Sequence, residues 1–154
     1  MKKYLFIYGL LKKGCSLSYV LDRTEYLGQS YFTGPFKLYQ HQDGYPCLIE
    51  TEFGSRNIFG EVYLIRNEET LYNIDRIECH PKQYKRCPVV VQMIHNNEYP
   101  NPIIAESYFF QKKESFKSTD LIETGSFSES KRIKRQNIIL ESNYLNDRMS
   151  HLCS

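Results

Sequence analysis

The sequence predicts an α+β fold, in which a small mixed or antiparallel sheet can close into a barrel and helices flank it. Three observations lead to this class. Short apolar runs bounded by turn residues indicate six or seven strands, and two other stretches favour helices. The strands follow one another in runs instead of alternating with helices. The chain has 154 residues, of which 41% are hydrophobic, so it can bury a core of its own.

Turn residues mark the limits of the predicted strands. Gly34-Pro35, Asp43-Gly44-Tyr45-Pro46 and residues 54–57 are typical turn sequences. The clearest strand covers residues 58–65, where Gly60 marks a bulge or the close approach of another segment. The full set of predicted strands is 3–8, 31–32, 36–39, 47–50, 58–65, 84–94 and 104–110.

Residues 67–77 change to a helical period. Asn67 is a suitable N-cap, and the acidic pair Glu68 and Glu69 favours the first turn. Apolar residues at positions 71, 74 and 77 fall on one face. The sequence therefore predicts one amphipathic helix that ends before Pro81, because proline disfavours helix at the residue before it.

Two further segments have weaker patterns. Residues 15–27 are compatible with a short helix that Gly28 ends. We expect a main domain at 1–112 and a C-terminal appendage at 113–154, partly helical and packed on the same globule. Within the appendage, a helix is expected at 131–149.

Composition argues against several classes of protein. The net charge of +2 gives no reason to expect binding to nucleic acid or to a membrane surface. No apolar stretch approaches the length of a membrane span. The apolar run at 4–8 is interrupted by Gly9 and has no cleavage site, so a buried strand is a better interpretation than a signal peptide. Five scattered cysteines then suggest a reduced, cytoplasmic protein.

Two stretches are candidates for a functional site. The strand at 4–8 breaks at Gly9, and a strand that opens into a loop exposes backbone N–H groups that can bind a carboxylate or phosphate. Glu78 lies at the end of the 67–77 helix, where the helix dipole opposes a negative charge. It is either a solvated helix-end carboxylate or a partly buried acid with a raised pKa, suited to proton transfer near neutral pH.

Other constellations are less convincing. Cys79 and His80 are adjacent in sequence, and adjacent side chains rarely face each other as a nucleophile and its base must. Cys79, His80 and Cys87 lack the paired spacing of a zinc site, so no metal is expected. There is neither a P-loop nor a Rossmann glycine pattern.

Taken in order, the motifs resemble those of the γ-glutamylcyclotransferase-like family, and most closely its γ-glutamylamine cyclotransferases. The resemblance covers residues 3 to 110. It is carried by Tyr8-Gly9-Leu10-Leu11 with Gly14, Gly44-Tyr45-Pro46, Gly60-Glu61-Val62-Tyr63, Ile74-Asp75-x-x-Glu78, and Tyr84-x-Arg86.

The resemblance implies a small β-barrel with flanking helices and a cofactor-independent enzyme for a small γ-glutamyl substrate. The α-amine of the substrate would attack its own γ-carbonyl, releasing 5-oxoproline and an amine. The turn formed by Tyr8, Gly9, Leu10 and Leu11 would bind the γ-glutamyl group through backbone N–H groups. Glu78 would accept and return the proton. Tyr84 and Arg86 would shape or brace the pocket.

One position departs from the family pattern. Leu10 stands where the family usually has serine or threonine, so a side-chain hydroxyl is missing. This departure favours the first of two alternatives to the γ-glutamylamine cyclotransferase, and the second would share all the residues named above. One is a module that binds an amino-acid-like ligand without turning it over, and the other is a cyclotransferase that removes a γ-glutamyl cap from a larger metabolite.

Overall fold

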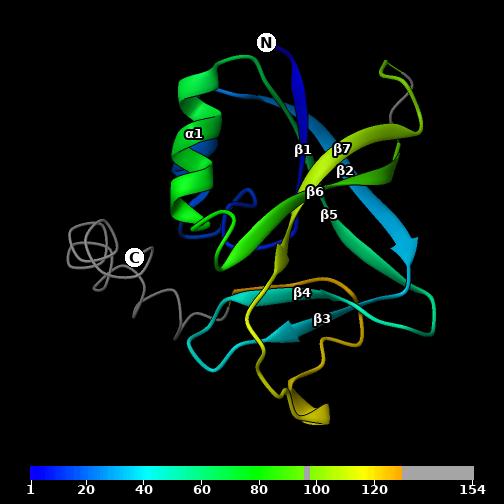
Figure 1. Ribbon diagram of the computed structural model, residues 1–154. Coiled ribbons are helices and arrows are strands. Elements are labelled where there is room, and N and C mark those ends of the chain that lie inside the picture. Colours follow the sequence, from blue (N-terminus) through cyan, green and yellow to red (C-terminus); the bar gives the residue numbers. More distant parts are fainter. Residues whose placement is uncertain (96–97, 130–154) are drawn as a thin grey trace.

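The computed structural model describes residues 1–95 and 98–129. Within them the chain forms seven strands, one α-helix and two short 3-10 helices (Figure 1). The strands are β1 (Lys3–Ile7), β2 (Glu25–Gly34), β3 (Phe36–Gln40), β4 (Pro46–Glu50), β5 (Arg56–Ile65), β6 (Tyr84–Met93) and β7 (Ile103–Phe110); the helices are η1 (Ser18–Leu21), α1 (Glu68–Ile77) and η2 (Ser118–Asp120).

Five of the strands close a barrel in the order β1-β5-β2-β6-β7, and β3 and β4 form a separate two-stranded sheet. All pairs in the barrel are antiparallel except the one that closes it, where β1 runs parallel to β7. The sheet is therefore mixed, as predicted. Gly60 in β5 explains the tight pairing of β5 with β1, because a Cβ atom there would collide with the carbonyl oxygen of Ile7.

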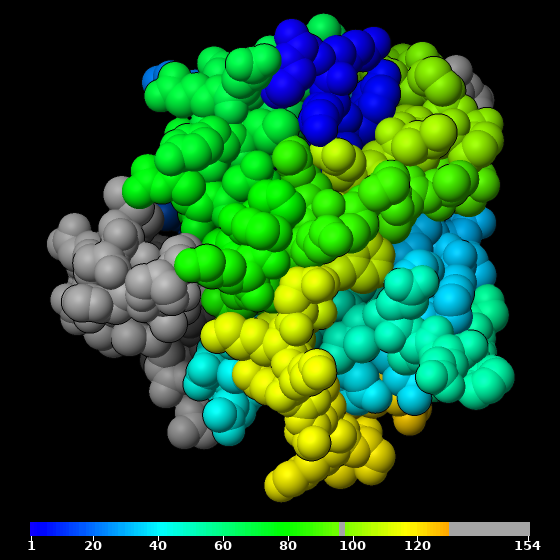
Figure 2. Space-filling model, viewed as in Figure 1, coloured from blue at the N-terminus to red at the C-terminus, as the bar shows by residue number. Residues whose placement is uncertain are grey.

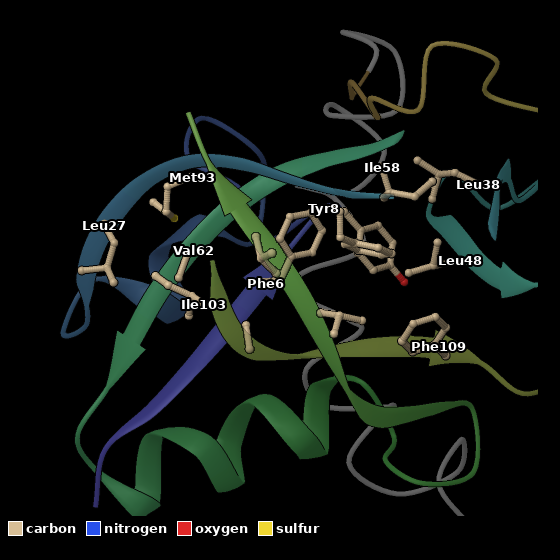
Figure 3. Close-up of a cluster of buried hydrophobic side chains, with 14 of the residues drawn as sticks. Phe6, Tyr8, Leu27, Leu38, Leu48, Ile58, Val62, Met93, Ile103 and Phe109 are labelled. Atoms are coloured by element: carbon tan, nitrogen blue, oxygen red, sulfur yellow. The ribbon is translucent and has the colours of Figure 1, made fainter. Parts of the chain in front are cut away.

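Strand β1 is buried on both faces, so its side chains divide between two apolar clusters. Phe6 and Tyr8 belong to a cluster among the barrel strands (Figure 3). In this cluster Phe6 packs edge-to-face on Phe32 at 4.9 Å between ring centroids. Leu5 and Ile7 belong to a second cluster, which also contains Ile74 of α1. The second cluster attaches the helix to the barrel, since burial of apolar surface is the main driving force for packing.

Helix α1 begins as the sequence predicts. The side chain of Asn67 accepts a hydrogen bond from the N–H of Glu69 at 2.7 Å. Leu71 and Ile74 are its buried residues. The described chain has no helix long and apolar enough to cross a membrane.

The predicted helix at 15–27 is wrong. Only one 3-10 turn, η1, forms there, and β2 already begins at Glu25. Gly28 does not end a helix but lies at a register shift in the pairing of β2 with β5, with φ of 137°. The apolar residues of this segment pack instead as a loop on the second cluster, where Leu21 is buried and Leu17 and Val20 are partly buried.

The segment after β7 lies along the β3–β4 sheet. Figure 2 shows it (yellow) beside the two strands (cyan), and Phe116 stacks on Tyr39 at 4.7 Å between ring centroids. Farther on, the N–H of Ile122 donates to the carbonyl of Leu38, and Phe127 is fully buried. The helix predicted at 131–149 lies outside the described residues, and the division at residue 112 stays a prediction.

The cysteines only partly match the expectation of a reduced protein. Cys15, Cys47 and Cys87 carry free thiols, whereas Cys79 takes part in a disulfide.

Candidate active site

The turn after β1 is held in place from two sides. The N–H of Lys12 donates to the carbonyl of Gly9 at 3.0 Å and closes a tight turn. Gly9 packs so closely on β4 that an added Cβ would lie 2.8 Å from Cγ of Pro46. Among residues 1–95 and 98–129, the N–H groups of Leu10 and Leu11 have no hydrogen-bond acceptor. The turn thus presents two adjacent backbone donors, the arrangement that binds an anion.

The two leucine side chains of this turn pack into the protein. Leu11 is buried in the second apolar cluster, and Leu10 is partly buried against the first. The side chain at position 10 therefore serves packing, and a ligand would meet this residue through its backbone.

Glu78 is the C-cap of α1, and the chain turns sharply after it. Cys79 adopts a left-handed conformation with φ of 50°. The N–H of Cys79 donates to the carbonyl of Arg76 at 3.1 Å, and that of His80 donates to the carbonyl of Asp75 at 2.9 Å. These two bonds define a Schellman motif. The helix ends where the sequence predicts, and the motif fixes the backbone that carries the Glu78 side chain.

Two buried tyrosines lie within reach of the Glu78 charge. Burial raises the pKa of Tyr8 well above its ordinary value, and the negative charge of Glu78 raises it further. Burial likewise raises the pKa of Tyr84 far above its usual range, with smaller contributions from Tyr8, Cys47 and Glu78. Both phenols therefore stay protonated at neutral pH. Tyr8, directly after β1, and Tyr84, at the start of β6, therefore both feel the charge of Glu78 at the end of α1.

Hydrogen bonds fix one phenol to barrel strand β7 and the other to strand β4 of the two-stranded sheet. The hydroxyl of Tyr8 donates to the carbonyl of Tyr108. The hydroxyl of Tyr84 donates to the carbonyl of Pro46 at 2.8 Å and lies 3.9 Å from Sγ of Cys47. Burial raises the pKa of the Cys47 thiol to about 12, so Cys47 is a neutral packing group and not a reactive thiolate.

Arg86 points at the helix and not at the turn. Its Nη2 lies 3.4 Å from Oδ2 of Asp75, and its Nη1 lies 3.2 Å from Oε2 of Glu106. Its backbone N–H donates to Nδ1 of His80, the residue two after Glu78. Arg86 therefore braces the C-terminal end of α1 against β6 and β7.

Two residues of this region were not assigned a role from the sequence. Asp75 accepts a hydrogen bond from the hydroxyl of Tyr108 at 2.7 Å in addition to its ion pair with Arg86. Tyr108 thus links the phenol of Tyr8, through its carbonyl, to the helix that carries Glu78. The sequence feature that could have pointed to Asp75 is its spacing of three residues from Glu78. Tyr108 lies in an apolar strand, and no feature of the sequence distinguishes it from its neighbours. Within the described residues, no cluster of three or more His, Cys, Asp or Glu side chains could hold a metal ion.

Fold and motifs together match one family. The family model for gamma-glutamyl cyclotransferase, AIG2-like, matches residues 5–129. The chain belongs to this enzyme family.

Two curated relatives share the assignment, both with the name "Putative gamma-glutamylcyclotransferase". The protein from Vibrio cholerae is 36% identical over 86 residues, which is 56% of this chain and 70% of the relative. The protein from Methanocaldococcus jannaschii is 32% identical over 131 residues, which is 82% of this chain and 97% of the relative.

Solved structures show the same fold at lower identity. An AIG2-like protein from Mus musculus superimposes with a TM-score of 0.70 at 22% identity, covering 82% of this chain and 88% of its own. A structure described as gamma-glutamyl cyclotransferase gives a TM-score of 0.54 at 17% identity, covering 74% of this chain and 69% of its own.

Proposed function

We propose that this protein is a γ-glutamylamine cyclotransferase. The α-amine of the substrate attacks the γ-carbonyl carbon, forms the five-membered lactam 5-oxoproline, and breaks the γ-amide bond. The amine loses a proton as it attacks, and the departing nitrogen gains one, so the free amine and 5-oxoproline are the only products. No enzyme nucleophile or cofactor is required.

The observation that carries this proposal is that the charge of Glu78 acts on Tyr8, at the start of the turn after β1. Tyr8 is followed by Gly9 and then by the two backbone donors of Leu10 and Leu11. A substrate whose α-carboxylate binds these donors would bring its α-ammonium group toward Glu78. The carboxylate can then accept the ammonium proton and return it to the leaving nitrogen.

The energetics suit a site with few catalytic groups. Holding a tethered nucleophile near its target can supply about 7–11 kcal/mol of the barrier. One general acid–base typically contributes a rate increase of about 10²–10⁴-fold. Tyr8 and Tyr84 support this role because their raised pKa values keep them neutral, so neither adds a second negative charge beside Glu78.

Two alternatives to a γ-glutamylamine cyclotransferase are supported by different arguments. Leu10 favours a module that binds without turnover, because the usual hydroxyl is absent and the side chain packs into the protein. An enzyme that removes a γ-glutamyl cap from a larger metabolite would use the same residues and differ only in the leaving group.

The test is release of 5-oxoproline from γ-glutamyl-ε-lysine, γ-glutamyl-alanine and glutathione. Wild-type protein should release it fastest from the first compound. Glu78→Gln should fold normally and lose turnover, and Glu68→Gln, at the exposed first turn of the same helix, is the matched control that should stay active. Substantial turnover by Glu78→Gln would rule out the assigned role, and binding without release from any compound would favour the binding module.

A further inference from the structure

Glu61 is a buried carboxylate outside the catalytic group described above. It lies in β5 directly across from Ile7 at the end of β1, and only 9% of its surface is exposed. One of its oxygens, Oε2, accepts two hydrogen bonds. The backbone N–H of Lys13 donates from 2.9 Å, and the hydroxyl of Tyr63 donates from 2.7 Å.

The bond to Lys13 falls at the exit of the anion-binding turn. The turn closes at Lys12, and Lys13 is the next residue along the chain. At the entrance, Gly9 is packed against Pro46 of β4. The turn is thus fixed between β4 at one end and the Glu61 carboxylate at the other, and the donors of Leu10 and Leu11 lie between these two points.

The residues next to Glu61 are closely packed. Gly60 precedes it and lets β5 approach the backbone of Ile7, where any side chain would collide. Tyr63 is itself buried, and burial, followed by its hydrogen bond to Glu61, raises the pKa of its phenol well above the ordinary value. The Tyr63 hydroxyl therefore remains a donor and holds the carboxylate oriented toward Lys13.

We propose that Glu61 is a positioning residue that fixes the turn of residues 9–12 so that its backbone donors bind the α-carboxylate of the γ-glutamyl group. The substrate named in this inference rests on the proposed function. The claim that Glu61 holds the turn rests only on the geometry of Glu61. Glu61 acts through Lys13 and touches no reacting atom, so its loss weakens substrate binding more than the chemical step.

The experiment compares Glu61→Ala with Glu61→Gln, and uses Glu25→Ala as the control. Glu25 also accepts a hydrogen bond from a tyrosine hydroxyl, that of Tyr99, but it is exposed, and its side chain pairs with Tyr99 and Arg66 and not with the turn. Glu61→Ala should raise KM for γ-glutamyl-ε-lysine by about 10-fold, the expected loss for one hydrogen bond to a charged group, with kcat within about threefold of wild type. Glu61→Gln keeps an oxygen that can accept both bonds and should stay close to wild type, as should Glu25→Ala.

A second readout does not depend on turnover. Amide hydrogen exchange of the peptide that covers residues 9–14 should be faster in Glu61→Ala and unchanged in Glu25→Ala. Absence of 5-oxoproline release from the wild type would refute the proposed function, while exchange would still report whether Glu61 holds the turn. Unchanged exchange in Glu61→Ala would overturn the inference, and so would an unchanged KM in the active, folded variant.

If Glu61→Ala does not fold, Glu61→Asp answers the same question. It keeps the charge but shortens the reach by one methylene, so the bond to Lys13 should be lost first. A raised KM with faster exchange at residues 9–14 supports the inference, and wild-type values for both contradict it.

Discussion

Replacing Asp75 with alanine removes the acceptor that ties α1 to β7. The carboxylate of Asp75 accepts a hydrogen bond from the hydroxyl of Tyr108 at 2.7 Å and forms an ion pair with the guanidinium of Arg86 at 3.4 Å. Both side chains of the ion pair are largely shielded, with 15% of Arg86 and 20% of Asp75 exposed. The helix that carries Glu78 therefore loses this polar attachment to the barrel.

The magnitude follows from these contacts. A hydrogen bond to a charged group contributes about 1.5–3 kcal/mol. Arg86 keeps Glu106 as a partner at 3.2 Å, so its charge is not left uncompensated and the larger cost of a broken buried pair does not apply. We expect Asp75→Ala to lower the free energy of unfolding by about 2–3 kcal/mol, which corresponds to a fall in Tm of roughly 5–10 °C for a domain of this size.

Urea denaturation followed by circular dichroism measures this change, and a double-mutant cycle assigns it. Tyr108→Phe removes the hydroxyl alone and leaves the carbonyl that accepts from Tyr8. The coupling energy between Asp75→Ala and Tyr108→Phe should be about 1–2 kcal/mol. Asp75→Asn keeps an oxygen for the hydroxyl and should lose less stability than Asp75→Ala.

The same variants test whether the attachment matters for the site. If α1 positions Glu78, Asp75→Ala should reduce kcat in the fraction that remains folded. A loss of stability below about 0.5 kcal/mol, the size of a typical surface substitution, would refute the assigned attachment. A coupling energy near zero would show that Asp75 acts without Tyr108.

Two further predictions concern the turn and the buried phenols. Gly9→Ala places a Cβ 2.8 Å from Cγ of Pro46, so overpacking should lower the free energy of unfolding by about 1–3 kcal/mol and raise KM. A wild-type free energy of unfolding together with a wild-type KM would contradict the close packing of the turn on β4. The raised pKa values of Tyr8 and Tyr84 make stability depend on pH, because above about pH 10 the unfolded chain loses phenol protons that the folded chain keeps. The free energy of unfolding should therefore fall as pH rises past about 10, and Tyr8→Phe should reduce that slope, which urea denaturation at pH 8 to 11 would show.

The parts of the fold that the sequence predicted best are those set by local chemistry. Helix α1 has its N-cap at Asn67 and ends before Pro81, as capping and proline geometry require. The helix expected at 15–27 failed because its last residues pair with β5, about forty positions away. Pairing at that distance in sequence overrides a moderate local periodicity, and the segment before it then packs as a loop.

In the candidate site, too, local sequence features point to some residues, and only long-range contacts bring the others together. Gly9 and Glu78 could be proposed from the sequence because each stands at the end of an element, where backbone donors or a helix dipole favour a particular chemistry, and their roles stay predictions. Tyr108 and Asp75 could not be paired from the sequence, because their contact requires β7 to lie beside α1. Their link depends on the closed barrel, and no local pattern encodes it.

The most direct test of the account is 5-oxoproline release from γ-glutamyl-ε-lysine by the wild type and by Glu78→Gln, measured side by side with the folded state of both confirmed. We expect release by the wild type and loss of turnover in the variant with KM largely kept, since the proposed site for the α-carboxylate is the backbone of Leu10 and Leu11. Equal rates of release by the two proteins would contradict the central role given to Glu78.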